Sequence, residues 1–544
     1  MNLSNSSFHS VQIARESIEL PGSVLNNLTV LLLTSTVALI SLYFLRADPL
    51  AHIPILAAER GDEKERRALF LKDAKSLYLE GRKKFGDGVY QITTSRHSKT
   101  IVVPTKFLEE LRKLPDDTLC NQCAADETLE SKYTRLNTHE PVHGHVLKTS
   151  LTPSLRRMNP RISAEIDHAV HANLPSQPAW TSVNIHHALL RIVASATGCI
   201  GIGAPLCRDD QYLAVTANYA GHVMAAGTAA SRVPLWLRPV LAPRLPEVKK
   251  LDALLAEAEA FMRPVIEERK RAMAEGKPAE GDLLQWMLET DRARFGLEDD
   301  RKVVTAYLGF VFAAIHSTTV VATNILYSLA AMRDFIPELR EEIRRAVDSH
   351  GGVLSFEALQ KMMKLDSVMK ESMRLYPLQH GPFFSPSANF QRKVLRPFTL
   401  STGVRIPSNT VLEFPTVTTS LDPSVFPDPH TFDPLRFYRI RTAPGADHSL
   451  NQFVTVSADA TWWGWGSHAC PGRFFAANEI KMVVAQIVLE WDVKMPGVGE
   501  GEALGSRELG GPWGEVGRWR NWEVGNFCFP DPTKELLFQR IMKD

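Results

Sequence analysis

Two long apolar stretches stand out in the pattern of hydrophobic and polar positions along the chain. The first runs from Leu28 to Leu45 without a charged residue, and Val24 to Asn27 can extend it. Eighteen helical residues at 1.5 Å each cover about 27 Å, which is close to the hydrocarbon thickness of a bilayer. The pattern predicts a transmembrane helix over residues 24–46, after a short lumenal tail of residues 1–23.

The residues around this stretch distinguish an anchor from a cleaved signal peptide. The tail has no basic start, because Arg15 is offset by Glu16 and Glu19, and Arg46 directly follows the apolar run. A signal peptide needs a basic start and a small-residue cleavage site. More basic residues follow Arg46, so in a eukaryote the positive-inside rule places the rest of the chain in the cytosol. We expect a single-pass protein of the endoplasmic reticulum membrane.

The second apolar stretch runs from Val303 to Met332 and contains no Asp, Glu, Lys or Arg. It could be a second membrane span, but His316, Ser317 and Asn324 lie in its middle, where lipid makes polar groups costly. A helix through the centre of a large folded domain accounts better for the pattern.

The remaining pattern predicts one mainly α domain with small β-sheets over residues 47–544. Helical periodicity dominates, and short strand-like segments occur near 86–104 and 385–415. Prolines become frequent after Pro377, which predicts long ordered coil there. No repeat or long linker divides this part of the chain.

Composition excludes several classes of protein. Lys plus Arg (62) nearly equals Asp plus Glu (61), which argues against nucleic-acid binding through phosphate neutralisation. Six cysteines in 544 residues are too few for a secreted disulfide framework and indicate a reducing compartment. Cys120 and Cys123 have zinc-like spacing without a second pair, so we expect an ordinary loop there.

One cysteine lies in a setting that favours a thiolate. Cys470 belongs to the segment from Trp462 to Phe475, where Gly466 and Gly472 permit the positive φ that would aim peptide N–H groups at a sulfur. An amphipathic run from Ala476 predicts a helix whose N-terminal end lowers a thiol pKa. A cysteine hydrolase with His468 as its base stays open, but the crowded aromatic rings favour a flat apolar ligand.

This segment resembles the haem-ligating loop of the cytochrome P-450 family, F-x-x-G-x-[HR]-x-C-x-G. The chain matches at Gly466, His468, Cys470 and Gly472, and has Trp463 where the family usually has Phe. The resemblance implies a P-450 fold, a haem b cofactor, Cys470 as the axial thiolate and His468 as a partner of a haem propionate. Trp463 would cover the sulfur side of the haem.

A second motif supports the resemblance. Glu371 and Arg374 are neighbours on one helix face, and such a pair is usually solvated and worth little. However, their flanks are apolar, and the segment Phe432–Phe437 follows at the distance of the family's P-x-R-F element. Together they resemble the family's structural triad, which implies that Glu371, Arg374 and Arg436 form a buried network.

The central helix departs from the family. The family usually has the motif [AG]-G-x-[DE]-T-[TS] in this helix. The corresponding segment here is Ala313–Thr318, in which His316 replaces the acid and Ser317 replaces the threonine. Ser317 is the candidate for relaying protons and Thr318 is the reserve. His316 either shuttles protons or is a core histidine bonded to a backbone carbonyl. This variant is similar to fungal ent-kaurene oxidases and other enzymes of secondary metabolism.

Two parts of the site stay less defined. The family's W-x-x-x-R propionate clamp is absent, and the candidates in its region are His145–Lys148 and Arg156–Arg157. The resemblance implies that Arg392, in the segment Gln391–Lys393, is a second propionate partner. Residues 377–384, which include Phe383 and Phe384, are expected to line an apolar pocket.

The resemblance implies a monooxygenase that takes electrons from an NADPH-cytochrome P-450 reductase and oxidises an apolar, terpenoid metabolite. NADPH would act only through the reductase. Two alternatives remain: a haem-thiolate isomerase or dehydratase that needs no reductase, and a non-catalytic haem-binding sensor.

Overall fold

The computed structural model describes residues 30–31, 34–36, 48–278, 281–378, 390–497 and 517–542. The chain divides into two compact units, residues 1–52 and 53–544, and every element named below belongs to the second. Most of the predicted transmembrane helix at 24–46 lies outside the described residues. So do the predicted lumenal tail at 1–23 and the predicted pocket residues Phe383 and Phe384.

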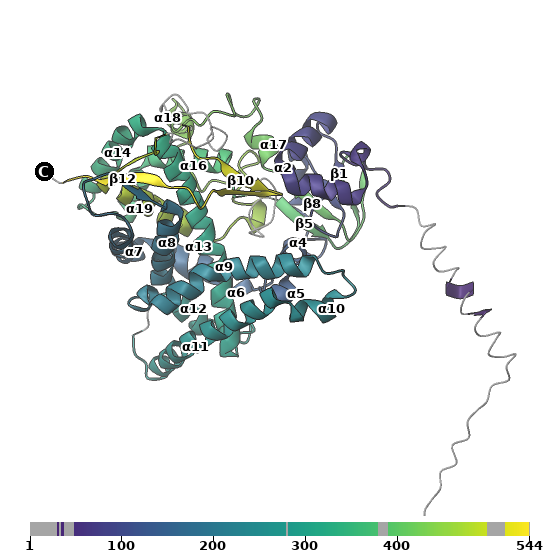
Figure 1. Cartoon of the computed structure of the whole chain (residues 1–544), viewed down its shortest axis with the longest axis horizontal. Coiled ribbons are helices and arrows are strands. Elements are labelled where there is room, and N and C mark those ends of the chain that lie inside the picture. Colours follow the sequence, from purple (N-terminus) through teal and green to yellow (C-terminus); the bar gives the residue numbers. More distant parts are fainter. Residues whose placement is uncertain are drawn as a thin grey trace, which may run out of the picture. The chain divides into compact units, whose positions relative to one another are not determined.

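The second unit is mainly helical, as predicted (Figure 1). Its α-helices are α2 (Glu63–Phe85), α3 (Leu108–Leu111), α4 (Asn121–Leu129), α5 (Ser131–Thr134), α6 (Pro141–Val146), α7 (Thr152–Asn173), α8 (Ile185–Gly201), α9 (Asp210–Ser231), α10 (Arg238–Leu241), α11 (Pro246–Ala274), α12 (Leu283–Glu289), α13 (Asp300–Ala331), α14 (Ile336–Asp348), α15 (Phe356–Lys361), α16 (Met363–Leu375), α17 (Val417–Ser420), α18 (Arg436–Thr442) and α19 (Arg473–Glu490). Its strands are β1 (Tyr90–Ile92), β2 (Thr100–Val102), β3 (Leu119–Cys120), β4 (Thr181–Val183), β5 (Phe390–Val394), β6 (Phe398–Thr399), β7 (Arg405–Ile406), β8 (Val411–Phe414), β9 (Trp491–Lys494), β10 (Asn521–Val524), β11 (Phe527–Pro530) and β12 (Leu536–Arg540).

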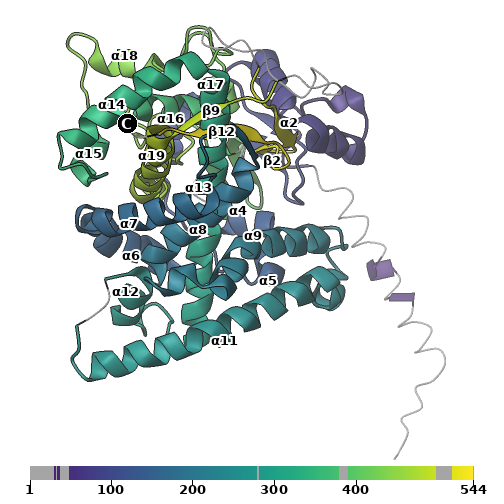
Figure 2. The ribbon, with the colours of Figure 1, turned by 60° about the vertical axis from the view of Figure 1, so that its left-hand side comes forward.

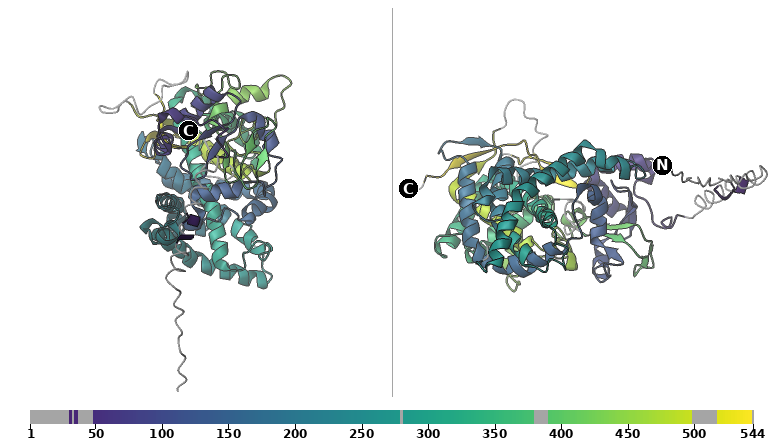
Figure 3. Two further views of the ribbon diagram at one scale, coloured as in Figure 1. Left: turned by 90° about the vertical axis from the view of Figure 1, so that its right-hand side faces the viewer. Right: turned by 90° about the horizontal axis from the view of Figure 1, so that it is seen from below.

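The largest sheet joins the two strand-rich regions that the sequence predicts. Its order is β1-β2-β8-β5-β3, with β2 and β8 parallel and the other pairs antiparallel. Figures 1 and 3 show this sheet together with α2 at one end of the helical part. The short β3 brings Cys120 opposite Lys393 of β5, next to Arg392.

The predicted central helix is α13, which packs against α8, α9, α16 and α19 (Figure 2). The Asp299 side chain caps its start by accepting from the Arg301 N–H. Hydroxyls inside the helix bond to carbonyls one turn back, as in Thr319 to Ile315 at 2.8 Å and Thr323 to Thr319 at 2.7 Å. These bonds satisfy polar groups that the apolar surroundings would otherwise make costly.

Among the described residues, α13 alone is long and apolar enough to cross a membrane by length and composition. However, 67% of its most apolar window is buried inside the protein. This burial agrees with a core helix, because the core helix of a soluble domain meets the same criteria of length and apolarity.

Helix α19 differs from the amphipathic run expected after the cysteine. All its residues from Ala477 to Val488 are buried, including Asn478, Glu479 and Lys481. The reason is its position, because α7, α13, α14 and α16 all pack against it. The helix therefore runs through the core instead of covering it.

Candidate active site

The cysteine loop reaches α19 through two residues with positive φ. Gly464 has φ +86° and Gly466 has φ +66°, a region that L side chains rarely adopt. A hydrogen bond of 2.7 Å from the Cys470 N–H to the Trp463 carbonyl closes the turn. Cys470 is half-buried and not disulfide-bonded, and it lies three residues before the first residue of α19.

The predicted positive φ is wrong at Gly472, which has φ −86°. Gly472 instead occupies the N-cap position of α19, where helical backbone follows at once. A Cβ at this position would lie 4.0 Å from the Cys470 sulfur, which is ordinary contact. Gly466 and Gly464 therefore provide the turn, and Gly464 has no place in the family pattern that the sequence matches.

One cavity of about 390 Å³ brings the cysteine loop and the central helix together. Cys470 and Gly472 line it from the loop, and Ser317 and Thr318 line it from α13. Its wall is mostly apolar, with Leu129, Phe310, Phe312, Val320, Leu378 and Phe529 among the lining residues. The cavity thus combines a sulfur, hydroxyl groups and an apolar wall.

The two hydroxyls on α13 have different environments. The Ser317 hydroxyl donates to the Ala313 carbonyl at 2.5 Å, so its proton is committed and its lone pairs can accept. Thr318 is 2% exposed, and its Oγ1 has no hydrogen-bond partner among the described residues. An unpartnered buried hydroxyl on a cavity wall can both donate to and accept from a molecule held there.

His316 also lines this cavity, but its ring bonds to the protein. The Nε2 atom lies 2.9 Å from the Ala217 carbonyl of α9, the geometry of the core-histidine alternative. Burial lowers the pKa of His316, so the neutral ring donates this bond and ties α9 to α13.

Basic side chains gather where the cavity meets the cysteine loop. His468 lies 2.7 Å from the Asp116 carboxylate, and burial together with the Arg392 charge lowers its pKa. Arg392 is 5% exposed and donates to Asn121 at 2.7 Å, and burial lowers its pKa to about 10. The Lys148 charge also acts on His468, and Lys148 lines the cavity. Of the three, Arg392 is buried and Lys148 is exposed, and cationic side chains near a cavity suit an anionic ligand group.

Among the basic candidates for the missing clamp, the structure places only Lys148 on the lining of this cavity. Arg156 is exposed and bonds to Glu357 at 2.6 Å, and His145 packs against the ring of Phe295. Sequence analysis did not single out His143, which lines the cavity and bonds to the Ala306 carbonyl. Its position two residues before the candidate His145 was the available signal.

Glu371, Arg374 and Arg436 come together in a buried network. Arg374 makes a bidentate pair with Glu371 at 2.7 and 2.8 Å, and Arg436 reaches the same carboxylate at 3.2 Å. The exposed fractions of the three side chains are 0%, 0% and 9%. Arg374 also donates to the carbonyls of Ser420 and Pro429, so the network holds the coil before α18 against α16.

Lys370, which sequence analysis passed over, is buried beside this network. Its Nζ donates to the Gln452 carbonyl at 3.1 Å and lies over the rings of Phe437 and Trp462. Burial lowers the pKa of Lys370 to about 7. Trp462 lines the cavity, and its Nε1 has no partner among the described residues. A lysine among apolar neighbours was the signal that could have identified this position.

Cys120 and Cys123 do not form an ordinary loop. They lie at the end of β3 and in the first turn of α4, and a disulfide joins them. The predicted ordinary loop is wrong because side chains three residues apart at the start of a helix lie close together. Here the two Cα atoms are 5.4 Å apart, within the range that a disulfide bridges.

A buried carboxyl on α19 predicts an unusual dependence of stability on pH. Burial raises the pKa of Glu479 to about 8 from its ordinary 4.5, and Thr197 donates to it at 2.9 Å. The folded protein thus keeps a proton that the unfolded chain releases. The stabilisation is complete below pH 4.5 and is lost as the pH rises to about 8, at up to about 1.4 kcal/mol per pH unit.

We therefore expect Glu479→Gln to remove most of the fall in stability between pH 5 and pH 8. Denaturant midpoints of wild type and variant across this range test it, with Glu268→Gln on the exposed face of α11 as the control. Parallel curves for wild type and Glu479→Gln would contradict the prediction.

Known proteins with similar sequences and structures support this description. A family model described as cytochrome P-450 matches residues 132–507. The chain is 36% identical over 450 residues to cytochrome P-450 monooxygenase ATR3 of Stachybotrys chlorohalonatus, covering 81% of this chain and 89% of that protein. It is 31% identical over 494 residues to cytochrome P-450 monooxygenase braC of Annulohypoxylon truncatum, covering 90% and 93%.

A solved structure shows the same fold. The retinoic acid-bound cyanobacterial CYP120A1 matches with a TM-score of 0.64 at 16% identity, covering 88% of this chain and 96% of that one. The family's haem is held by a cysteine, and the cavity fits such a group. It offers a cysteine sulfur, the Lys148 ammonium group and two polar atoms without a partner among the described residues, Thr318 Oγ1 and Trp462 Nε1. The sequence matches, together with the fold, show that the chain belongs to the cytochrome P-450 family and is a monooxygenase similar to those of fungi.

Proposed function

We propose that this monooxygenase is anchored in the endoplasmic reticulum membrane and oxidises an apolar metabolite of the terpenoid class with dioxygen. Its electrons come from NADPH through a membrane-bound cytochrome P-450 reductase. The observation that carries the proposal is the single cavity lined by Cys470, by the hydroxyls of α13 and by a largely apolar wall. The substrate class is proposed from the Ala313–Thr318 variant, which resembles that of fungal ent-kaurene oxidases.

In this proposal Cys470 would hold haem b, Arg392 and Lys148 would offer positive charge to its propionates, and the His468 ring would offer them a hydrogen bond. A thiolate-ligated haem supplies the cleavage of bound dioxygen. The protein binds and orients the substrate against the apolar wall and excludes water there. Trp463 packs edge-on against Phe453 and covers the sulfur side.

Ser317 and Thr318 are proposed to hold and pass on protons. Ser317 Oγ can accept a hydrogen bond from a bound water, and Thr318 Oγ1 can donate one. A positioned relay of this kind contributes roughly 10²–10⁴ in rate. His316 positions the helix in this scheme, because its Nε2 is already bonded to Ala217.

Ser317→Ala is therefore expected to keep haem and substrate binding but to divert electrons to hydrogen peroxide. Product formed per NADPH, measured beside peroxide release, should fall, and it should fall further in Ser317→Ala/Thr318→Ala. Thr305→Ala, which removes an exposed hydroxyl on the same helix, serves as the control. Unchanged coupling in the double variant would remove the relay from the proposal.

Turnover with and without the reductase tests the function itself. Holoprotein in membranes should consume a terpenoid substrate only when NADPH, dioxygen and reductase are all present. Turnover of a peroxide or epoxide without the reductase would favour the isomerase, and haem binding without any turnover would favour the sensor. Comparing the metabolites of gene-deleted and parent strains identifies the substrate to use.

The anchor is proposed from the apolar run at 24–46, with residues 47–544 as the cytosolic catalytic domain. Deleting residues 1–46 is expected to move the protein from the membrane pellet to the supernatant while haem binding persists. Carbonate extraction followed by haem quantification measures both. A truncated protein without haem, beside a full chain that binds it, would contradict the proposed domain boundary.

A further inference from the structure

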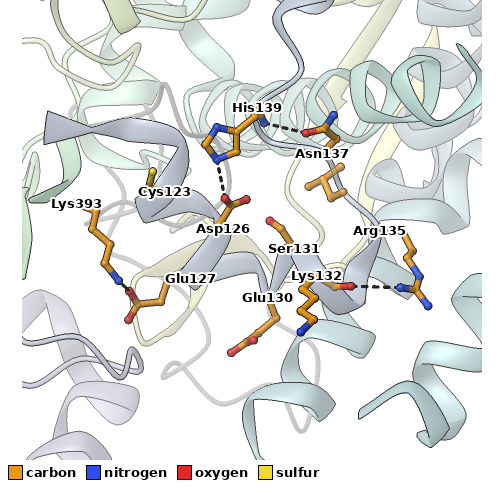
Figure 4. Close-up of a pocket in the computed structure, with 11 residues that line it drawn as sticks. Cys123, Asp126, Glu127, Glu130, Ser131, Lys132, Arg135, Asn137, His139 and Lys393 are labelled. Atoms are coloured by element: carbon orange, nitrogen blue, oxygen red, sulfur yellow. Dashed lines mark hydrogen bonds and ion pairs between the residues drawn. The ribbon is translucent and has the colours of Figure 1, made fainter. Parts of the chain in front are cut away.

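The disulfide between Cys120 and Cys123 lies between the molecular surface and the active-site cavity. Cys120 is only 6% exposed, whereas Cys123 is half-buried and lines a surface pocket of about 610 Å³ (Figure 4). Charged and polar residues make up most of the pocket lining, including the Lys393–Glu127 ion pair and the hydrogen-bonded pair His139 and Asp126, both at 2.7 Å. One sulfur of the bond is therefore accessible and the other is shielded.

We propose that Cys120 and Cys123 form a reversible thiol–disulfide site whose reductant is a dithiol, and that Cys123 is the sulfur attacked. The proposal rests on the cytosolic placement proposed above, where dithiols are abundant. Disulfides in that compartment are usually transient and take part in redox chemistry. Among the described residues, the one group of side chains that could hold a metal ion is Asp167, His171 and Glu490, so the pair does not belong to a metal cluster.

The exchange proceeds in two balanced steps. A thiolate of the dithiol attacks the Cys123 sulfur, a mixed disulfide forms, and Cys120 leaves as a thiolate with the bonding electron pair. The second thiolate of the dithiol then attacks the sulfur that the dithiol contributed to the mixed disulfide. This step closes the dithiol's own disulfide and releases Cys123 as a thiolate. Two electrons and two protons pass from the dithiol to the cysteine pair, and the dithiol becomes a disulfide.

The structure stabilises the leaving group of the first step. The Cys123 N–H donates to the Cys120 sulfur at 3.0 Å, and Cys120 is the N-cap residue of the nine-residue helix α4. A thiolate at a helix N-terminus is stabilised by the N–H groups and the dipole there. Attack at Cys123 is therefore favoured both by access and by the thiolate that it releases.

The two residues between the cysteines connect the disulfide to the active-site cavity. Asn121 and Gln122 line the cavity, and the Asn121 amide oxygen accepts from Arg392 at 2.7 Å. The disulfide ties the first turn of α4 to β3, which pairs with β5 beside Arg392. Opening the disulfide frees this turn and with it Asn121. The hydrogen bond from Arg392, whose side chain is proposed to face the haem, is then weakened.

The first test measures the bond without turnover. Folded holoprotein is treated with dithiothreitol, with reduced thioredoxin or with buffer, and then with a maleimide, and the peptide holding both cysteines is analysed by mass spectrometry. We expect no adduct in buffer and adducts on both cysteines after dithiol treatment. If catalytic amounts of thioredoxin open the disulfide, the reductant is a protein dithiol. If only dithiothreitol opens it, the reductant is a small-molecule dithiol. Adducts in buffer, or none after either dithiol, overturn the proposal whether or not the enzyme turns over.

The single variants Cys120→Ser and Cys123→Ser test which sulfur is attacked, each serving as the control for the other. With oxidised glutathione, Cys123 in the first variant is expected to form a mixed disulfide at least about tenfold faster than Cys120 in the second, because exchange requires access. Equal rates overturn the assignment of Cys123.

Haem transfer to excess apomyoglobin tests the link to Arg392. We expect the reduced protein to lose haem about tenfold faster than the oxidised protein, the effect of weakening one hydrogen bond to a charged group. Asn121→Ala should lose haem rapidly in both states. An unchanged rate on reduction overturns the link to Arg392.

Discussion

Replacing Cys470 with serine is expected to abolish the red-shifted absorption of the ferrous carbon monoxide complex and all product formation. The electron donation that favours cleavage of the dioxygen bond comes from a thiolate ligand, and a serine hydroxyl does not provide it. Cys470 alone among the six cysteines lies on the cavity wall of the described residues. No other described sulfur can therefore take over its role. Difference spectra of dithionite-reduced membranes measure the effect.

The matched control is Cys528→Ser in β11. This cysteine is 1% exposed, its sulfur accepts from Asn521 at 3.2 Å and it does not line the cavity, so the substitution tests the cost of losing a buried thiol that cannot reach a ligand there. It should keep the red-shifted spectrum. A Cys470→Ser protein with that spectrum intact would disprove the ligand assignment.

Arg374→Ala is expected to lower the yield of haem-bound protein severely, and not merely the turnover number. The substitution leaves the Glu371 carboxylate without its bidentate partner at a site with no solvent exposure. Breaking a buried ion pair in this way costs roughly 3–5 kcal/mol. The carbonyls of Ser420 and Pro429 also lose their donor, so the coil that precedes the cysteine loop loosens. Haem content per purified protein, and the denaturant midpoint, measure the loss.

Arg439→Ala provides the comparison within the same region. Arg439 is on α18 like Arg436, but its side chain is 59% exposed and pairs with Asp433 at the surface. Exposed pairs are worth about 0–1 kcal/mol, so this variant should be close to wild type. Similar haem yields from Arg374→Ala and Arg439→Ala would show that the buried network is not needed for the fold.

The sequence was sufficient for the family, the fold class and the candidate ligand. These depend on local signals: a glycine-rich turn before a cysteine, an E-x-x-R pair with apolar flanks, and an uncharged stretch of thirty residues. The central helix was predictable because its polar residues are Ser, Thr, Asn and His. Such side chains bond within the helix or to its neighbours, as Thr319 and Thr323 do.

Several features of the site depend on distances between residues far apart in the chain. Whether His316 meets a water or the Ala217 carbonyl depends on how α9 crosses α13, and nothing local to either helix specifies that. Lys148 lines the cavity while Arg156 points to Glu357, although both lie in the same predicted region. The burial of every residue from Ala477 to Val488 likewise comes from the helices packed around α19, not from the pattern of α19 itself.

Sequence alone thus determined the chemistry that a short segment carries, because backbone turns and helix faces are set by neighbouring residues. Tertiary structure decided which side chains are buried, which hydroxyl on α13 lacks a partner among the described residues and which cysteine of the disulfide is accessible. Burial and hydrogen bonding of this kind arise only when distant elements pack together. Packing also determines pKa values, since desolvation by other elements lowers that of Lys370 to about 7 and raises that of Glu479 to about 8.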